Sequence, residues 1–123
     1  MVARHKLLLV DDDEAVIDYL GVKLGGEFEL IATGSPDQVL GLAREHGPDL
    51  VLCDIDLPGM DGGDISAALF AHPETHHIPL VFLTALVSPA DLKARGNQLA
   101  GRAAISKQSP IGEIVARIRA ILG

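Results

Sequence analysis

Short apolar runs that alternate with helix-like segments are the feature that most restricts what this chain can fold into. The run at 6–10 ends in three acidic residues, and apolar residues then recur at helical spacing over 14–24. The same strand-then-helix unit is expected four more times. We predict strands at 6–10, 28–32, 50–53, 80–83 and 103–106, and helices at 14–24, 36–46, 64–70, 89–95 and 111–122.

Five strands that alternate with five helices predict an α/β fold. The strands are continuously apolar, which is typical of a parallel sheet that is covered by helices on both faces. Right-handed crossovers and a length of 123 residues favour a flavodoxin-like, doubly wound five-stranded parallel sheet with strand order 2-1-3-4-5. We expect residues 1–123 to form one domain. Glycines and polar residues interrupt any periodicity over 93–101, so we expect that segment to be irregular.

Composition excludes several classes of protein. The formal net charge of −7 argues against direct binding of nucleic acid, because phosphate contacts need clustered Lys and Arg. We find no apolar stretch typical of a signal peptide or a membrane span. The single cysteine, Cys53, cannot form an internal disulfide. These observations favour a cytoplasmic location without membrane contact.

Polar residues follow four of the five predicted strands directly. Asp11 and Asp12 follow the first strand, Asp54 the third, Thr84 the fourth and Lys107 the fifth. Because ligands of open α/β sheets gather at the carboxyl ends of the strands, we expect these side chains to converge. Neighbouring carboxylates repel one another unless a cation neutralises them. Hard oxygen ligands of this kind favour Mg²⁺ over Zn²⁺.

Four sequence blocks resemble response-regulator receiver domains of two-component signalling systems. The blocks are L-L-L-V-D-D-D-E at 7–14, P-D-L-V-L-C-D-I-D-L-P-G-M-D-G at 48–62, P-L-V-F-L-T-A at 79–85, and Ser106-Lys107. The second block is highly specific, and the resemblance extends along essentially the whole chain.

This resemblance implies a role for each matching residue. Asp54 would accept a phosphoryl group from a phosphohistidine of a sensor histidine kinase or a histidine phosphotransfer domain. Asp12, Asp54 and the main-chain carbonyl of Asp56 would hold Mg²⁺, with Asp11 assisting through water. Thr84 would be the switching hydroxyl and Lys107 the ion-pairing lysine. Such a domain is a signalling phosphoacceptor rather than an enzyme, with self-phosphorylation and self-dephosphorylation as its only catalysis.

Two positions depart from the family pattern. Most receivers carry Tyr or Phe three residues before the lysine, where this chain has Ala104. The lysine is usually followed by proline with a cis peptide, whereas here Gln108 follows. Because a cis bond before a non-proline residue costs about 2.5–4 kcal/mol, we predict a trans Lys107–Gln108 peptide with the Lys107 ammonium still close to Asp54.

Other functions remain alternatives at this point. The first is a receiver-fold interaction module that works without phosphorylation. The Asp54-Ile55-Asp56 sequence also imitates the nucleophile pair of haloacid dehalogenase phosphatases, although that family places the pair after its first strand. A flavin-binding module of the same fold would need a phosphate-binding loop after the first strand, where this chain has three acids. The output partner, or a fused output domain, is not identified by the sequence.

Several of these residue types also have purely structural explanations. We expect Asp13 to cap the first helix, and Cys53 to be a small, inert core residue. The histidines at 72, 76 and 77 lie among prolines and acids without a ligand spacing typical of zinc, so we expect a solvated loop there.

Overall fold

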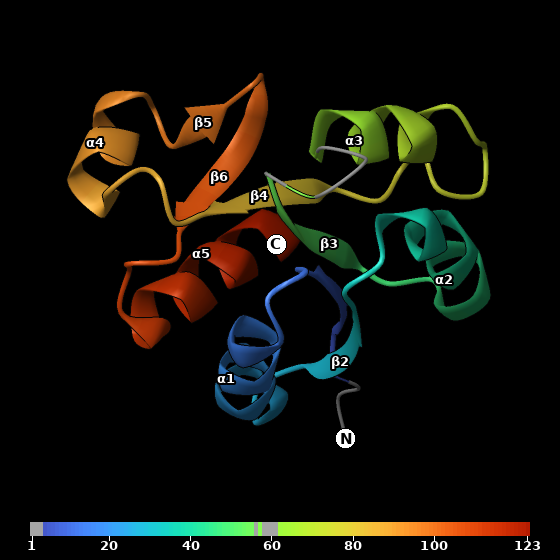
Figure 1. Ribbon diagram of the computed structural model, residues 1–123, viewed down its shortest axis with the longest axis horizontal. Helices are drawn as coiled ribbons and strands as arrows, with labels where there is room; N and C mark the ends of the chain where they lie inside the picture. Colours follow the sequence, from blue (N-terminus) through green and yellow to red (C-terminus); the bar gives the residue numbers. More distant parts are fainter. Residues whose placement is uncertain (1–3, 56, 58–61) are drawn as a thin grey trace.

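The computed structural model describes residues 4–55, 57 and 62–123, and they form a sheet covered by helices on both faces (Figure 1). The strands are β1 (Lys6–Val10), β2 (Glu29–Thr33), β3 (Leu50–Asp54), β4 (Leu80–Thr84), β5 (Gln98–Leu99) and β6 (Arg102–Ser106). The helices are α1 (Glu14–Gly25), α2 (Val39–His46), α3 (Gly62–Phe70), α4 (Pro89–Ala94) and α5 (Ile111–Leu122), with a 3-10 turn, η1, at Pro36–Gln38.

The strand order confirms the predicted doubly wound topology, with one addition. Along the sheet the order is β2-β1-β3-β4-β6-β5, in which the five longer strands run parallel. The prediction of five strands was therefore one too few. The extra strand, β5, pairs antiparallel with β6 through Gln98↔Ala103 and Leu99↔Arg102. A polar residue followed by one leucine has no periodicity from which a strand could be predicted.

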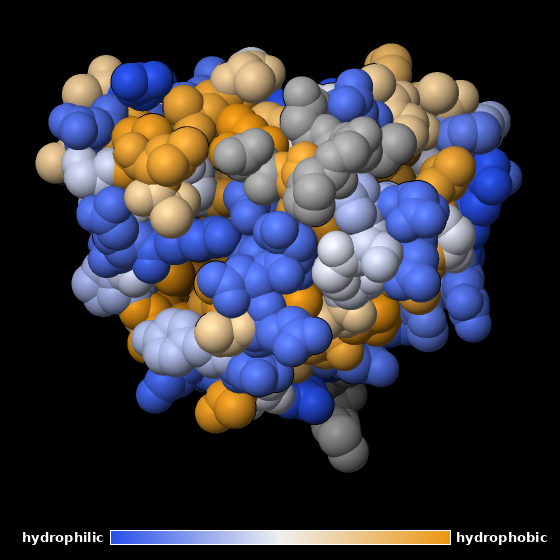
Figure 2. All heavy atoms as spheres, in the orientation of Figure 1, coloured by the Kyte–Doolittle hydropathy of each residue, from blue (hydrophilic) through white to orange (hydrophobic). Residues whose placement is uncertain are grey.

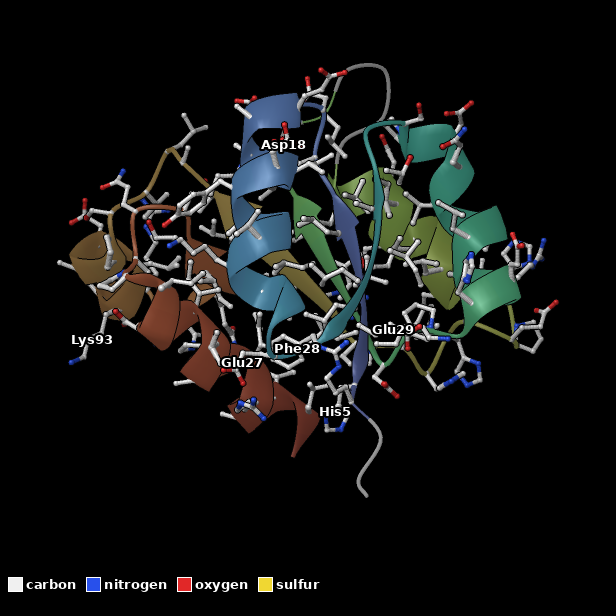
Figure 3. The ribbon with its side chains drawn as sticks, turned by 90° about the horizontal axis from the view of Figure 1, so that it is seen from below. His5, Asp18, Glu27, Phe28, Glu29 and Lys93 are labelled. Atoms are coloured by element: carbon white, nitrogen blue, oxygen red, sulfur yellow. The ribbon has the colours of Figure 1, made fainter. Side chains whose placement is uncertain are left out.

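Alternate residues of each strand point to opposite faces, so the sheet supports two hydrophobic cores. One core joins α1 and α5 to the sheet through Leu20, Leu24, Ile114 and Ile118. The other core joins α2, α3 and α4 to the opposite face. Figure 3 shows α1 in front of the strands with α5 beside it, and Phe28 at the foot of α1. Arg119 of α5 lies 5.3 Å from the centre of the Phe28 ring and forms an ion pair with Glu27.

The ends of the helices show where local sequence determines the fold. Asp13 is the N-cap of α1, as predicted, because its carboxylate accepts a hydrogen bond from Ala15 N–H at 3.0 Å. Gly47 ends α2 with a φ of +56°, a conformation that favours glycine. Ser35 precedes the 3-10 turn without a side-chain cap bond, and Thr33 Oγ1 bonds to both Ser35 N–H and the Gln38 side chain instead.

The segment predicted to be irregular is a series of tight turns around β5. Asn97 and Ala100 have positive φ values of 57° and 49°, and Gly96 and Gly101 are also left-handed. These turns fold the chain back so that β5 can pair with β6. Among the described residues, no helix is both long enough and apolar enough to cross a membrane.

Candidate functional site

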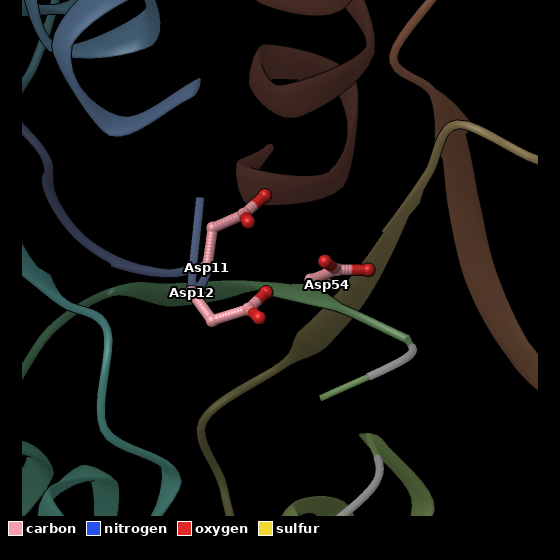
Figure 4. A group of neighbouring side chains, drawn as sticks. All are labelled: Asp11, Asp12 and Asp54. Atoms are coloured by element: carbon pink, nitrogen blue, oxygen red, sulfur yellow. The ribbon is translucent and has the colours of Figure 1, made fainter. Parts of the chain in front are cut away.

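The carboxyl ends of β1 and β3 bring three carboxylates together. Val10 and Cys53 are paired in register, so the residues that follow them emerge side by side. Among the described residues, Asp11, Asp12 and Asp54 each offer an oxygen within 4.8 Å of the others. Figure 4 shows the three carboxylates facing a common space, Asp11 and Asp12 from the end of β1 and Asp54 from β3. The predicted convergence is therefore observed.

Lys107 supplies the positive charge of this cluster. Its Nζ lies 2.6 Å from Asp11 Oδ2 and 3.3 Å from Asp54 Oδ2. The Asp11 side chain is completely buried, and the side chains of Lys107 and Asp54 are only 16% and 13% exposed. Asp11 Oδ2 accepts no well-directed hydrogen bond from any described residue, so the lysine charge is what compensates it. Ion pairs with this little solvent are screened weakly.

The carboxylates hold Lys107 in its charged form. Burial alone would lower the pKa of the ammonium, because it disfavours the charged state. The close contact with Asp11 and its negative charge, followed by the negative charge and the hydrogen bond of Asp54, outweigh burial and raise the pKa of Lys107 above its ordinary value. The ammonium is therefore a permanent cation at neutral pH.

Asp11 and Asp12 have different surroundings although they are neighbours in sequence. Asp11 Oδ1 accepts a hydrogen bond from Asp13 N–H at 2.9 Å, which fixes the side chain beneath the start of α1. Asp12 is exposed to solvent, whereas the side chain of Asp54 is mostly buried. Asp11 is thus buried and held by a hydrogen bond, whereas Asp12 is accessible from solvent.

Thr84 lies at the end of β4, next to the strand that carries Asp54. Asp54 and Leu83 are partners in register, so Thr84 emerges one residue beyond the strand pair. Thr84 is buried, and its hydroxyl accepts a hydrogen bond from Leu86 N–H at 3.1 Å. Its carbonyl oxygen accepts a bond from Lys107 N–H at 2.7 Å, which joins the threonine and the lysine through the backbone.

The Lys107–Gln108 peptide is trans, as predicted, since no described peptide bond is cis. The predicted proximity of Lys107 to Asp54 is also confirmed, at 3.3 Å. Gln108 has a contact that sequence reasoning missed: its side-chain amide donates to the carbonyl oxygen of Ala85 at 3.1 Å. The contact depends on how β4 and β6 pair, and no local sequence pattern encodes that.

The donor set fits a small, hard divalent cation. Three carboxylates, one of which has a buried oxygen without a directed hydrogen bond, leave an excess of negative charge that a single lysine does not balance. Oxygen ligands in small number, with room for water, are what Mg²⁺ requires. Asp56, whose main-chain carbonyl was predicted as a further ligand, lies outside the described residues.

Cys53 precedes Asp54 but takes no part in the polar cluster. The residue is fully buried on β3. Burial, followed by the charges of Asp54 and Asp11, raises the pKa of its thiol to about 12. The thiolate is the reactive form of cysteine, so the raised pKa disfavours reaction. Cys53 is a small core residue, as predicted.

The histidines at 72, 76 and 77 do not form a metal site in the part of the chain that the structure describes. His72 Nδ1 lies 2.8 Å from Arg44 Nη2, and His76 Nδ1 lies 2.9 Å from the carbonyl oxygen of Pro73. Only the Asp11, Asp12 and Asp54 group has metal-ligand spacing among the described residues. The expectation of a solvated loop is consistent with these contacts.

Comparison with known proteins identifies the family. The family model described as "Response regulator receiver domain" matches residues 7–119. The chain belongs to the response regulator receiver family.

A curated relative shares the receiver sequence along almost the whole chain. The DNA-binding response regulator MtrA of Mycobacterium tuberculosis is 38% identical over 120 residues, which are 97% of this receiver chain and 51% of MtrA. The chain thus spans about half the length of the curated relatives it matches first.

Solved receiver structures share the fold. A putative response regulator from Chloroflexus aurantiacus superposes with a TM-score of 0.80 at 32% identity, covering 97% of this chain and 98% of that one. The receiver domain of the sensor histidine kinase PA1611 from Pseudomonas aeruginosa superposes with a TM-score of 0.81 at 20% identity, covering 98% and 99%. Its structure is described as having a magnesium ion coordinated in the active site cleft.

Proposed function

We propose that this receiver domain is the phosphoacceptor switch of a two-component phosphorelay, and that Asp54 accepts the phosphoryl group. The observation that carries the proposal is the cluster at the end of β3, where Asp54 lies beside Asp11, Asp12 and the Lys107 ammonium. A carboxylate can act as a nucleophile toward phosphorus when neighbouring positive charge offsets the negative charge that gathers there.

The proposed step is an in-line displacement at phosphorus. A carboxylate oxygen of Asp54 forms a bond to phosphorus while the bond from phosphorus to the imidazole nitrogen of the partner histidine breaks. The electron pair of the broken bond stays on that nitrogen, and the product on this chain is an acyl phosphate. Lys107 Nζ, 3.3 Å from Asp54 Oδ2 before transfer, would pair with a phosphoryl oxygen afterwards.

A Mg²⁺ ion belongs to this proposal because the donor set fits it. Asp12 and Asp54 would hold the ion, with Asp11 assisting through water and the Asp56 main-chain carbonyl as the further ligand that the sequence predicted. When bound, the ion would supply positive charge to the phosphoryl oxygens. The magnesium described for the Pseudomonas receiver domain supports this assignment by analogy.

Thr84 would couple the phosphoryl group to the surface of the domain. Its buried hydroxyl accepts a bond from Leu86 N–H while the hydroxyl hydrogen is available to donate elsewhere. We propose that this hydrogen is donated to a phosphoryl oxygen on Asp54. The loop from Ala85 to Pro89 would then change conformation and signal phosphorylation to a partner. Ala104 favours this route, because no aromatic side chain at position 104 is present to act as the switch.

The proposed role is signalling rather than turnover of a separate substrate, with slow self-phosphorylation and self-dephosphorylation as its only catalysis. The proposed partner is a sensor histidine kinase or a histidine phosphotransfer domain in the cytoplasm. DNA binding belongs to MtrA as a whole, and this domain, with its net charge of −7, would not contact nucleic acid itself.

Labelling with acetyl phosphate tests the assignment of Asp54. We expect intact-protein mass spectrometry to show one phosphoryl group on the wild type when Mg²⁺ is present, and none on Asp54→Asn. Asp18→Asn, which removes an exposed carboxylate on α1, is the matched control and should label like the wild type. Equal labelling of the wild type and Asp54→Asn would overturn the assignment. A wild type that stays unlabelled with acetyl phosphate and with a phosphohistidine donor would instead indicate the phosphorylation-independent interaction module.

A further inference from the structure

Two loops lie side by side at the edge of the sheet that carries the site (Figure 1). The first follows β4 and contains Ala85 and Val87, and the second follows β6 and contains Gln108. Their starting points, Thr84 and Ser106, are partners in the register of β4 and β6. Any movement of one loop therefore takes place against the other.

Ser106 joins these loops through a buried hydroxyl. Its Oγ donates a hydrogen bond to the carbonyl oxygen of Val87 at 2.7 Å and accepts one from Gln108 N–H at 3.1 Å. Ser106 is only 1% exposed. A buried hydroxyl that both donates and accepts is held in one orientation, because water is not available to replace either partner.

The Gln108 side chain adds a second link, which is weaker. Its amide donates to the Ala85 carbonyl oxygen at 3.1 Å, but Gln108 is exposed and water competes for both groups. The stronger of the two side-chain links is therefore the one through Ser106.

The loop that Ser106 holds also contains the group that bonds to Thr84. Leu86 N–H donates to the Thr84 hydroxyl, and the next residue, Val87, accepts from Ser106. If Thr84 turned toward Asp54 with Leu86 still bonded to it, the Val87 carbonyl would be drawn away from Ser106. In the resting arrangement the Ser106–Val87 bond opposes that movement.

We propose that Ser106 is a positioning residue that holds the β4–α4 loop in its resting place, and that its bond to Val87 breaks when the phosphoryl group recruits Thr84. This inference rests on the proposed function of Asp54. It assigns to a hydroxyl the control that an aromatic side chain at position 104 cannot exert, because Ala104 is fully buried and small. Val87 packs against the hydrophobic cluster that includes Ala104, so the loop is held by packing on one side and by Ser106 on the other.

The position of Lys107 does not depend on this bond. Its N–H is bonded to the Thr84 carbonyl oxygen, and its ammonium is held by Asp11 and Asp54. Removing the Ser106 hydroxyl should therefore release the loop without disturbing the charged cluster. This separation makes the proposal testable by ligand affinity.

The test compares Ser106→Ala with Ser106→Thr, which keeps a hydroxyl. Beryllofluoride with Mg²⁺ serves as the probe of the phosphoryl-bound state, and Mg²⁺ alone as the probe of the resting site. We expect Ser106→Ala to bind beryllofluoride about three- to tenfold more tightly than the wild type, the range that loss of one net hydrogen bond gives. Its Mg²⁺ affinity should stay within about twofold of the wild type, and Ser106→Thr should restore wild-type affinity for both probes.

Two further measurements keep the outcomes distinct. Ser66→Ala removes another buried serine hydroxyl, on α3, and should leave the beryllofluoride affinity unchanged. Amide hydrogen exchange of residues 85–88 without any ligand should be faster in Ser106→Ala than in the wild type. Unchanged or weaker beryllofluoride binding by Ser106→Ala would overturn the role of Ser106. Failure of the wild type itself to bind beryllofluoride would instead count against Asp54 as the phosphoacceptor.

Discussion

Where β1 and β3 end, the side chains of the site are carboxylates, and where β4 and β6 end, they are hydroxyls. Asp11, Asp12 and Asp54, which we call the carboxylate half, repel one another and depend on the Lys107 ammonium. Thr84 and Ser106, which we call the hydroxyl half, are neutral and have hydrogen-bond partners in the adjoining loops. Both halves lie at the same edge of one sheet.

The difference shows how the work of the proposed phosphorylation switch would divide within this site. The carboxylate half is limited by charge, so its state changes when a cation or a phosphoryl group arrives. The conformation of the hydroxyl half is determined by hydrogen bonding and packing, so this conformation changes when an adjoining loop moves. Lys107 is the link between them, because its side chain belongs to the first half and its backbone N–H to the second.

Of the substitutions that test this difference between the two halves, Lys107→Met should have the largest effect on the free energy of unfolding. The methionine keeps the apolar stem but leaves the buried Asp11 carboxylate without a compensating charge. Breaking such a pair is strongly destabilising, and we expect the free energy of unfolding without Mg²⁺ to fall by about 3 kcal/mol. Urea denaturation measures this.

Lys93→Met is the matched control, because Lys93 is exposed on α4 and its replacement changes the net charge by the same amount. It should alter the free energy of unfolding by less than about 0.5 kcal/mol. Adding Mg²⁺ should recover part of the loss in Lys107→Met. A Lys107→Met protein as stable as the wild type without Mg²⁺ would show that the carboxylate half is not limited by charge.

Binding of Mg²⁺ should stabilise the protein through the carboxylate half alone. A ligand that binds only the folded state at one hundred times its Kd adds about 2.7 kcal/mol to the free energy of unfolding. We expect this gain in the wild type and little of it in Asp12→Asn, measured at matched ionic strength. Without Mg²⁺, Asp12→Asn should be slightly more stable than the wild type, by less than about 1 kcal/mol because Asp12 is exposed.

Asp18→Asn controls for the loss of one negative charge outside the cluster and should retain the full gain from Mg²⁺. An Asp12→Asn protein that gains as much as the wild type would place the cation elsewhere.

Changing Gly62 to alanine should test the packing limit beneath the hydroxyl half. A Cβ at Gly62, the first residue of α3, would lie 2.5 Å from Cε1 of Phe82, which is paired in register with Ala104. Phe82 is 1% exposed, so its ring has little freedom to withdraw. We expect the free energy of unfolding to fall by about 1–3 kcal/mol, the usual cost of overpacking.

Gly41→Ala provides the contrast, because a Cβ there meets nothing within 4 Å and the residue lies on an exposed turn of α2. Thermal unfolding should show that Gly41→Ala gains about 0.5–1 kcal/mol from the higher helix propensity of alanine. If Gly62→Ala and Gly41→Ala were equally stable, the Phe82 ring would be able to move aside at no cost in free energy. That result would contradict the view that packing limits movement in the hydroxyl half.

The sequence predicted the carboxylate half more completely than the hydroxyl half. Asp11, Asp12 and Asp54 follow continuous apolar runs, so strand ends alone bring them together. The hydrogen bond from Ser106 to Val87 was missed because Val87 lies 19 residues away and meets Ser106 only through the register of β4 and β6.

The same contrast holds for the fold. The bounds of β1 and α5 agree with the predicted ranges, because a short apolar run that ends in acids and a strongly amphipathic helix are both clear in the sequence. β5 was not predicted, because turns with positive φ at Asn97 and Ala100, neither of which is glycine, create it. Such turns are favoured by tertiary contacts more than by local sequence.

The short strand β5 has a consequence for how copies of this domain behave at high concentration. A sheet exposes unpaired N–H and C=O groups along its edge strand, and strands from other molecules can pair with these groups. Here β5 pairs with Arg102 and Ala103. The next residue, Ala104, donates its N–H to the Asn97 carbonyl oxygen and accepts from the Arg117 guanidinium at 3.1 Å. The outer edge of β6 is thus paired with groups of the same chain, which protects this edge against edge-to-edge aggregation.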